Sequence, residues 1–142
     1  MNNALSFDIE EYFHAEVFSG VVRREEWSAL ESRVARTTEL LLELLDEAAT
    51  AATFFVLGSL AERYPALLKR MIAEGHAIGS HTYTHALHPS EEQARHELSK
   101  TANAIRKATG KEPILFRPPG GSRSNLTCRL AVQQNYAVIL WT

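Results

Sequence analysis

Short apolar runs alternate with segments of helical periodicity along the chain, and this alternation constrains the fold more than any other feature. Each run is bounded by turn-forming or polar residues, as buried strands are. Parallel strands need a long crossover between them, usually a helix. The alternation therefore predicts an α/β fold whose parallel strands are joined by right-handed crossovers. The predicted strands are residues 4–8, 52–57, 77–79, 114–116 and 136–141, and predicted helices begin near 34, 60, 90 and 126.

Two kinds of residue mark the limits of these segments. Thr37 or Thr38 is suited to cap the first predicted helix. Pro65 predicts a restart within the helix over 60–73, because proline is accepted in a first turn but not in a helix interior. Residues 11–33 mix aromatic residues, glycine and charges, and they are predicted to form a long structured loop.

Composition excludes several classes of protein. Lys and Arg number 15 and Asp and Glu 17 in 142 residues, a net charge of −2, so the basic excess of a nucleic-acid binder is absent. Cys128 is the only cysteine, which excludes a disulfide within the chain. No apolar stretch approaches the roughly 20 residues that span a bilayer. The length suits one domain over 1–142, and acids near the start disagree with a signal peptide, so we expect a cytoplasmic protein.

Polar groups follow three of the predicted strands. Acids follow the first strand, two histidines follow the third, and Arg117 follows the fourth. The carboxyl ends of parallel strands meet at one edge of a sheet, where functional groups of such folds gather. We therefore expect these side chains to converge. The acids are Asp8, Glu10 and Glu11, and the histidines are His81 and His85.

Two histidines and one carboxylate form the donor set of a hydrolytic metal site with open coordination positions. His81 and His85 are four positions apart, so a helical segment there would bring both imidazoles to one side. Asp8 and Glu10 point the same way along a strand end. Glu10 has the longer reach and is assigned to the metal, and Asp8 to the general base. Arg117 would pair with Asp8 and orient it.

Plainer interpretations compete with each of these assignments. A pair of histidines with this spacing is often incidental, and acids at a strand end often cap a helix or face solvent. The turn at Pro118 and Pro119 is stiff, and Gly120 after it permits close approach, so its backbone N–H is predicted to donate to an oxyanion. Substrate contact is assigned to Pro118, Pro119 and Trp141, with packing as the alternative for Trp141.

Four motifs follow one another along the chain: Asp8 to Glu10, Ala52 to Gly58, Gly75 to His85 and Phe116 to Gly120. Together they resemble one known family, the polysaccharide deacetylases of the NodB-homology type, also called carbohydrate esterase family 4. The opening of the chain looks most like the exosortase-associated (PEP-CTERM locus) branch. The resemblance implies a distorted (β/α) barrel, of which this chain would form a part.

The resemblance implies metal-dependent N-deacetylation of an N-acetylated glycan. His81 and His85 match the metal histidines of the family, and Asp8 matches its base. Glu10 takes the place of the carboxylate ligand, with Glu11 as its competitor. Zn²⁺ fits this donor set, and Co²⁺ or Ni²⁺ would also be accepted. The residues that match the base-orienting arginine and the oxyanion donor are Arg117 and Gly120.

The family normally continues past Trp141 with an acidic motif and a Leu-x-His motif that supplies the general acid. We therefore expect a fragment or a degenerate member, whose unclosed sheet edge favours association of copies. Two alternatives stay open: an allantoinase-like amide hydrolase on the same scaffold, and a non-catalytic member that binds metal or glycan.

Overall fold

A computed structural model describes residues 4–18, 20–121 and 126–141. Its centre is a parallel sheet of five strands in the order β1-β2-β3-β4-β5. The strands are β1 (Ser6–Ile9), β2 (Thr53–Val56), β3 (Ala77–Ser80), β4 (Leu115–Phe116) and β5 (Ala137–Val138). The helices are α1 (Val34–Glu47), α2 (Gly58–Arg63), α3 (Pro65–Ala73), α4 (Glu91–Thr109) and α5 (Leu126–Gln133). Short 3-10 turns lie at Tyr12–His14, Glu16–Phe18, Arg24–Ala29 and Pro119–Gly121.

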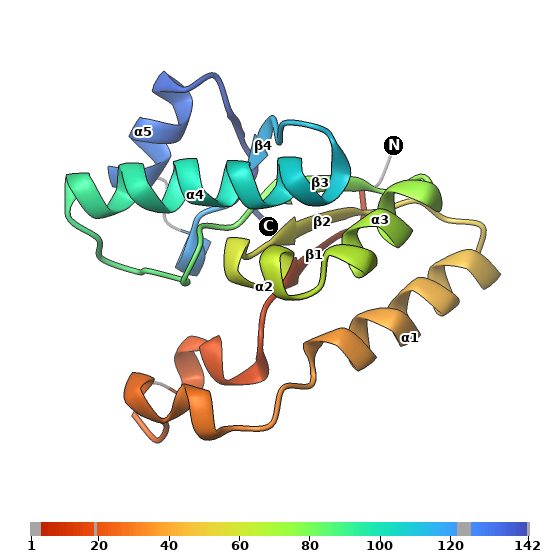
Figure 1. Cartoon of the computed structure of the whole chain (residues 1–142), viewed down its shortest axis with the longest axis horizontal. Helices are drawn as coiled ribbons and strands as arrows, with labels where there is room; N and C mark the ends of the chain where they lie inside the picture. The colour runs from red at the N-terminus through yellow and green to blue at the C-terminus, as the bar shows by residue number, and fades with distance from the viewer. Residues whose placement is uncertain (1–3, 19, 122–125, 142) are drawn as a thin grey trace.

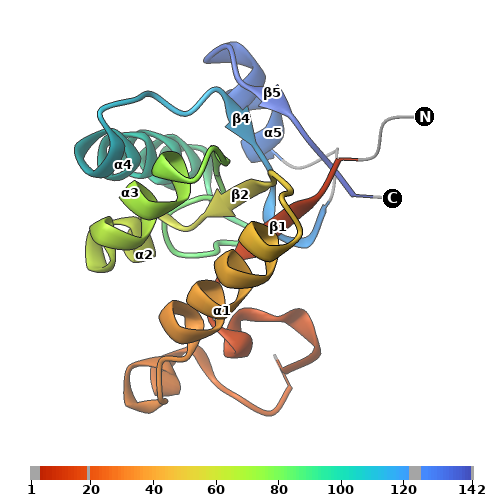
Figure 2. The same ribbon diagram turned by 90° about the vertical axis from the view of Figure 1, so that its right-hand side faces the viewer.

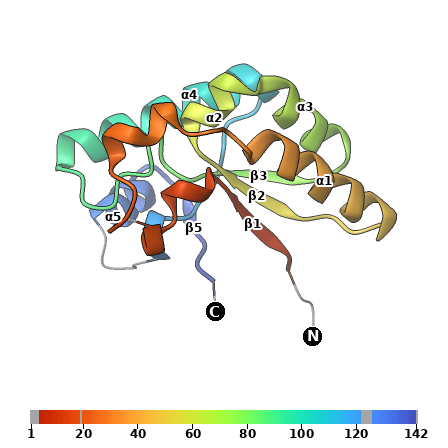
Figure 3. The same cartoon turned by 90° about the horizontal axis from the view of Figure 1, so that it is seen from below.

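Helices α1 to α4 cover one face of the sheet (Figures 1 and 3). Phe54 and Val56 of β2 point into this helical layer and are fully buried. They pack in one core with Leu42, Leu68 and Ile105. Helix α5 lies beside β5 (Figure 2) and also packs against α4. A second core forms there around the buried ring of Phe116.

The opposite face of the sheet carries different side chains. The ring of Phe55 lies over Gly79, where an added Cβ would be 2.6 Å from the ring. The guanidinium carbon of Arg117 lies 4.1 Å from the centroid of the same ring. Phe55 is therefore fully buried although it lies on the face of the sheet opposite to α1–α4. This face corresponds to the inner wall of a barrel that the described strands form only in part.

The structure confirms the predicted α/β class and the parallel strand order. Pro65 begins α3, directly after α2 has ended at Arg63, so the predicted restart is confirmed. Strand β5 covers only Ala137–Val138, whereas a strand over 136–141 was expected. Within the described residues β5 has a partner strand on one side only, so nothing there extends its pairing. The expected association through this open edge stays a prediction.

The predicted cap of the first helix is wrong. Thr37 and Thr38 lie inside α1, and Thr38 is buried. The carboxylate of Glu11 accepts the backbone N–H groups of Arg33 and Val34 at 3.0 and 3.3 Å. A carboxylate distant in sequence therefore satisfies the first turn of α1, which no local pattern could reveal. No helix in the described ranges is long and apolar enough to cross a membrane.

Candidate active site

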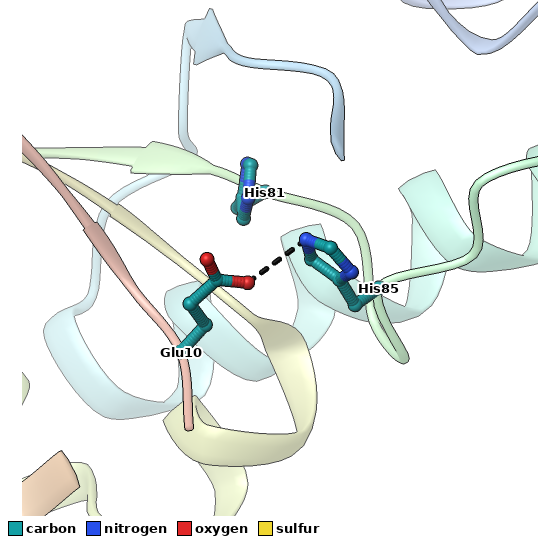
Figure 4. A group of neighbouring side chains, drawn as sticks. All are labelled: Glu10, His81 and His85. Atoms are coloured by element: carbon teal, nitrogen blue, oxygen red, sulfur yellow. Dashed lines mark ion pairs between the residues drawn. The ribbon is translucent and has the colours of Figure 1, made fainter. Parts of the chain in front are cut away.

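Three of the predicted side chains meet at the carboxyl ends of the strands. Glu10 follows β1, His81 follows β3, and His85 lies in the loop between β3 and α4. One ligand atom from each lies within 4.8 Å of the others (Figure 4). Both histidines are buried, and Glu10 is partly exposed. The geometry that the sequence predicted for these residues is present, whereas their role as metal ligands stays a prediction.

The segment that carries the histidines is not helical, so the helical arrangement under which spacing alone would bring both imidazoles to one side is absent. Thr82 and His85 have positive φ angles of 68° and 59°, which an α-helix excludes. Helix α4 holds this loop through Glu97, whose carboxylate accepts the backbone N–H groups of Tyr83 and Thr84 at 2.6 and 2.7 Å. It also accepts the Thr84 hydroxyl at 2.8 Å. The two imidazoles therefore meet through a loop clamped from α4.

The start of α2 supports the loop from the other side. The backbone N–H groups of Gly58 and Ser59 donate to the carbonyls of Thr82 and Tyr83 at 2.9 and 3.2 Å. A Cβ on Gly58 would lie 2.5 Å from the Tyr83 ring and 2.8 Å from the backbone of Thr101. Glycine at this position lets α2 and the loop approach each other closely. This contact sets the position of the loop that carries His85.

The donor atoms of these three residues are arranged to bind a cation rather than to form hydrogen bonds with one another. Nε2 of His85 lies 2.8 Å from Oε2 of Glu10. That contact lacks hydrogen-bond geometry, so Oε2 is a buried oxygen without a hydrogen bond in the described structure. The Nδ1–H of His81 donates to the carbonyl of Arg117 at 2.8 Å, which leaves Nε2 as the available nitrogen. Two imidazole nitrogens and one carboxylate oxygen thus face a common point, as ligands of a divalent ion do.

The electrostatics of the group favour a charged Glu10 carboxylate and a neutral His81 imidazole. Burial raises the pKa of Glu10, but its contact with His85 and the nearby His81 and His14 outweigh this, and the pKa lies below its usual value. Burial also lowers the pKa of His81, although Asp8 and Glu10 oppose the shift. Neutral imidazole and ionised carboxylate are the forms that bind metal.

Arg117 connects the predicted base to this group. Its Nη1 donates to Oδ1 of Asp8 at 2.9 Å, and its Nη2 donates to Oγ of Ser6 at 2.7 Å. Arg117 is only 3% exposed, which makes the ion pair with Asp8 a largely desolvated one. Because the carbonyl of the same residue accepts from His81, one residue orients both the predicted base and a predicted ligand. Sequence reasoning found the pair with Asp8 but missed Ser6 and the carbonyl contact.

Glu11 is not available to the histidines. It is buried, and its carboxylate accepts the hydroxyl of Ser32 in addition to the first N–H groups of α1. Its neighbour Glu10 is the acid that lies with His81 and His85. Of the two acids between which the sequence left the choice open, Glu10 is the one that lies beside the histidines, and its role as the carboxylate ligand stays a prediction.

The loop after β4 places the remaining predicted residues. Pro118 and Pro119 are buried, and Gly120 is exposed with a φ of 69°. Trp141 is half-exposed, and its ring covers Gly121 and lies 5.4 Å from the guanidinium carbon of Arg117. This contact agrees with the packing alternative for Trp141. Substrate contact by these residues and oxyanion stabilisation by Gly120 stay predictions.

Sequence reasoning missed His14. Its ring stacks on His85, with centroids 5.6 Å apart and an interplanar angle of 14°. Its Nδ1 accepts the backbone N–H of Glu11 at 3.3 Å. Burial and the neighbouring His85 lower the pKa of His14 to about 4. The position of His14 shortly after the acids at 8–11 could have indicated that it lies near the site. The segment 11–33 has no regular periodicity, so the direction of its side chains could not be predicted.

Comparisons with known proteins identify relatives of this chain in sequence and in structure. A family model described as polysaccharide deacetylase matches residues 29–139. A peptidoglycan-N-acetylglucosamine deacetylase of Bacillus cereus is 35% identical over 107 residues, which cover 74% of this chain and 39% of that protein. A peptidoglycan-N-acetylmuramic acid deacetylase of Bacillus subtilis is 37% identical, over 74% of this chain and 22% of that protein.

A solved family 4 carbohydrate esterase from Streptomyces lividans, in complex with acetate, has a similar structure. Its TM-score is 0.74 at 27% identity, and the match covers 98% of this chain and 62% of the esterase. The chain thus spans about two-fifths of the B. cereus relative and a smaller part of the B. subtilis one. These matches give no support to the allantoinase-like alternative, and the exosortase-associated branch stays a prediction.

Proposed function

The chain belongs to the polysaccharide deacetylase family, and from this premise we propose that it hydrolyses the N-acetyl amide of an N-acetylated glycan, using a divalent ion. The observation that carries the proposal is the convergence of Glu10, His81 and His85 from distant parts of the chain. Asp8 and Arg117 are joined to the same group through His81.

The residues fit a metal that retains open coordination positions. Two nitrogen ligands and one oxygen ligand leave room for water and substrate. A divalent ion bound there polarises a carbonyl group and acidifies water. Zn²⁺ is our first choice for this donor set, and Co²⁺ or Ni²⁺ would also bind.

The chain's own residues supply the remaining chemistry. Asp8 accepts a proton from the water that attacks the acetyl carbonyl. Arg117 holds Oδ1 of Asp8, so the carboxylate keeps one orientation while its other oxygen works as the base. Gly120 lies in an exposed turn after the two prolines and donates its backbone N–H to the oxyanion that develops.

The test measures metal content and acetate release together. Zinc-loaded chain is incubated with chitotetraose, and free acetate is quantified. Asp8→Asn is expected to retain zinc and lose acetate release about 100-fold or more, because it removes a general base. The double variant His81→Ala, His85→Ala is expected to lose both.

His96→Ala is the matched control, since it removes an exposed imidazole of α4 that lies outside the group. Equal zinc content in the double variant and the unaltered chain would remove the metal site. Zinc binding without acetate release from any N-acetylated glycan would leave the alternative of a non-catalytic binding protein.

A further inference from the structure

A pocket of about 340 Å³ opens beside the predicted metal site, between the segment 11–33 and residues 85–88 of the loop that leads to α4. His85 forms part of its wall, so the pocket and the predicted metal site share a side chain. We propose that this pocket binds a carboxylate-bearing sugar next to the N-acetyl group, and that Arg24 selects the carboxylate. The inference rests on the proposed function and names the substrate class of that same site.

Aromatic rings form much of the pocket. The centroid of the Trp27 ring lies 5.7 Å from that of Phe13 and 4.4 Å from that of His14. His14 in turn stacks on His85. Ligand pockets combine such apolar walls with a few polar groups that set orientation. A wall of this kind suits the C–H face of a sugar ring and brings that ring beside His85.

Two side chains of this pocket, Trp27 and Arg24, have N–H donors that form no hydrogen bond with a carboxylate in the described structure. Nε1 of Trp27 is buried and has no hydrogen-bond partner among the described residues, an arrangement that a native structure rarely leaves unexplained. The guanidinium of Arg24 lies over the Trp27 ring, 5.1 Å from its centroid, and donates one N–H to the carbonyl of Thr84 at 2.9 Å. An arginine carries five N–H donors, so Arg24 retains others for a ligand.

The charges in the pocket single out Arg24. Its neighbour Arg23 also lines the pocket but forms an ion pair with Glu26 at 3.0 Å. Arg24 has no ion pair within the ranges that the structure describes. An unpaired guanidinium fixed on an aromatic ring at the edge of a sugar-sized pocket recognises a planar anion, and carboxylate is the anion that sugars commonly carry.

The family match begins at residue 29, so Phe13, His14, Arg24 and Trp27 precede it, as Asp8 and Glu10 do. On the other wall of the pocket, His85, Leu87 and His88 lie inside the match. The pocket therefore joins the segment before residue 29 to the loop that carries a predicted metal histidine.

The test compares glycans that differ in the carboxylate. Dissociation constants are measured by calorimetry on the full chain after chelator treatment, so that no substrate is consumed and no ion attracts the carboxylate. The neutral probe is chitotetraose. A hyaluronan tetrasaccharide supplies a uronate carboxylate, and an N-acetylglucosamine–N-acetylmuramic acid tetrasaccharide supplies a lactyl carboxylate.

We expect one carboxylated glycan to bind about tenfold more tightly than chitotetraose, as a charge-assisted contact allows. The better of the two identifies the source of the carboxylate. Arg24→Gln is expected to remove this preference. Arg63→Gln is the matched control, because Arg63 also stacks on an aromatic ring, at 5.2 Å from the centroid of Tyr64, and does not line the pocket. It should keep the preference.

Two results would overturn the inference: no carboxylated glycan binds more tightly than chitotetraose, or Arg24→Gln weakens all glycans alike and keeps the preference. Acetate release is assayed separately on zinc-loaded chain. Release without a carboxylate preference leaves the proposed function standing and removes the role of the pocket. Carboxylate-selective binding without acetate release supports the role of the pocket and contradicts the proposed function.

Discussion

At the scale of single residues, the site depends on a few buried polar groups with more than one partner. Arg117 holds Asp8 with its side chain and His81 with its carbonyl. The carboxylate of Glu97 accepts three hydrogen bonds from the histidine loop, from the backbone N–H groups of Tyr83 and Thr84 and from the hydroxyl of Thr84. Residues in the second layer of a metal site commonly change affinity by 10- to 100-fold when they are replaced. We therefore expect the strongest indirect effects at Arg117 and Glu97.

Replacing Glu97 by Gln should weaken zinc binding about tenfold, because the loop that carries His85 loses its charged acceptor. The measurement is a competition titration with a zinc chelator. Glu62→Gln serves as the control, since Glu62 accepts the hydroxyl of Tyr83 at 2.7 Å from an exposed position. Unaltered zinc affinity in Glu97→Gln would show that the loop keeps its conformation without this clamp.

At the scale of elements, the strands deliver the functional groups and irregular segments orient them. The register pairs Asp8 with Phe55 and Phe55 with Gly79, so polar groups after β1 and β3 start from the same level of the sheet. The direction in which each side chain then points is set by contacts outside the strands. Glu11 illustrates this, because it turns to the first turn of α1 while Glu10 turns to His85.

Replacing Glu11 by Ala should destabilise the fold by about 2 kcal/mol, because the donors at Ser32, Arg33 and Val34, whose hydrogen bonds are buried or partly buried, lose their acceptor. Urea denaturation followed by circular dichroism measures the change in the free energy of unfolding. Glu39→Ala, at an exposed position of α1, should change it by less than about 0.5 kcal/mol. Equal effects of the two substitutions would contradict the capping role of Glu11.

At the scale of the whole molecule, the described residues form an open parallel sheet with helices on one face. Arg117, Phe55 and Trp141 cover part of the other face through ring and guanidinium contacts. The group of Glu10, His81 and His85 lies at one edge of this arrangement and joins the ends of β1 and β3. Binding of an ion there should therefore stabilise the fold as a whole.

Zinc should raise the thermal midpoint of unfolding, because an ion that binds only the folded chain adds about 2.7 kcal/mol at 100 times its dissociation constant. For a domain of this size we expect a rise of about 8 °C. Differential scanning calorimetry with zinc, and again after a chelator, measures it. The midpoint of the double variant His81→Ala, His85→Ala should not respond, and an equal rise in that variant would mean that the ion binds elsewhere.

The sequence by itself determined the order of strands and helices and the positions at which polar groups leave the sheet. Both follow from local features: apolar periodicity, turn residues such as Pro65, and the rule that parallel strands place their carboxyl ends together. Only the tertiary structure decided that Glu10 and not Glu11 joins the histidines, that residues 81–85 form a loop, and that residues 11–33 build a pocket beside His85. Each of these depends on contacts between segments far apart in the chain, such as Glu11 with α1 and Glu97 with the histidine loop. Such contacts cannot be predicted from local periodicity.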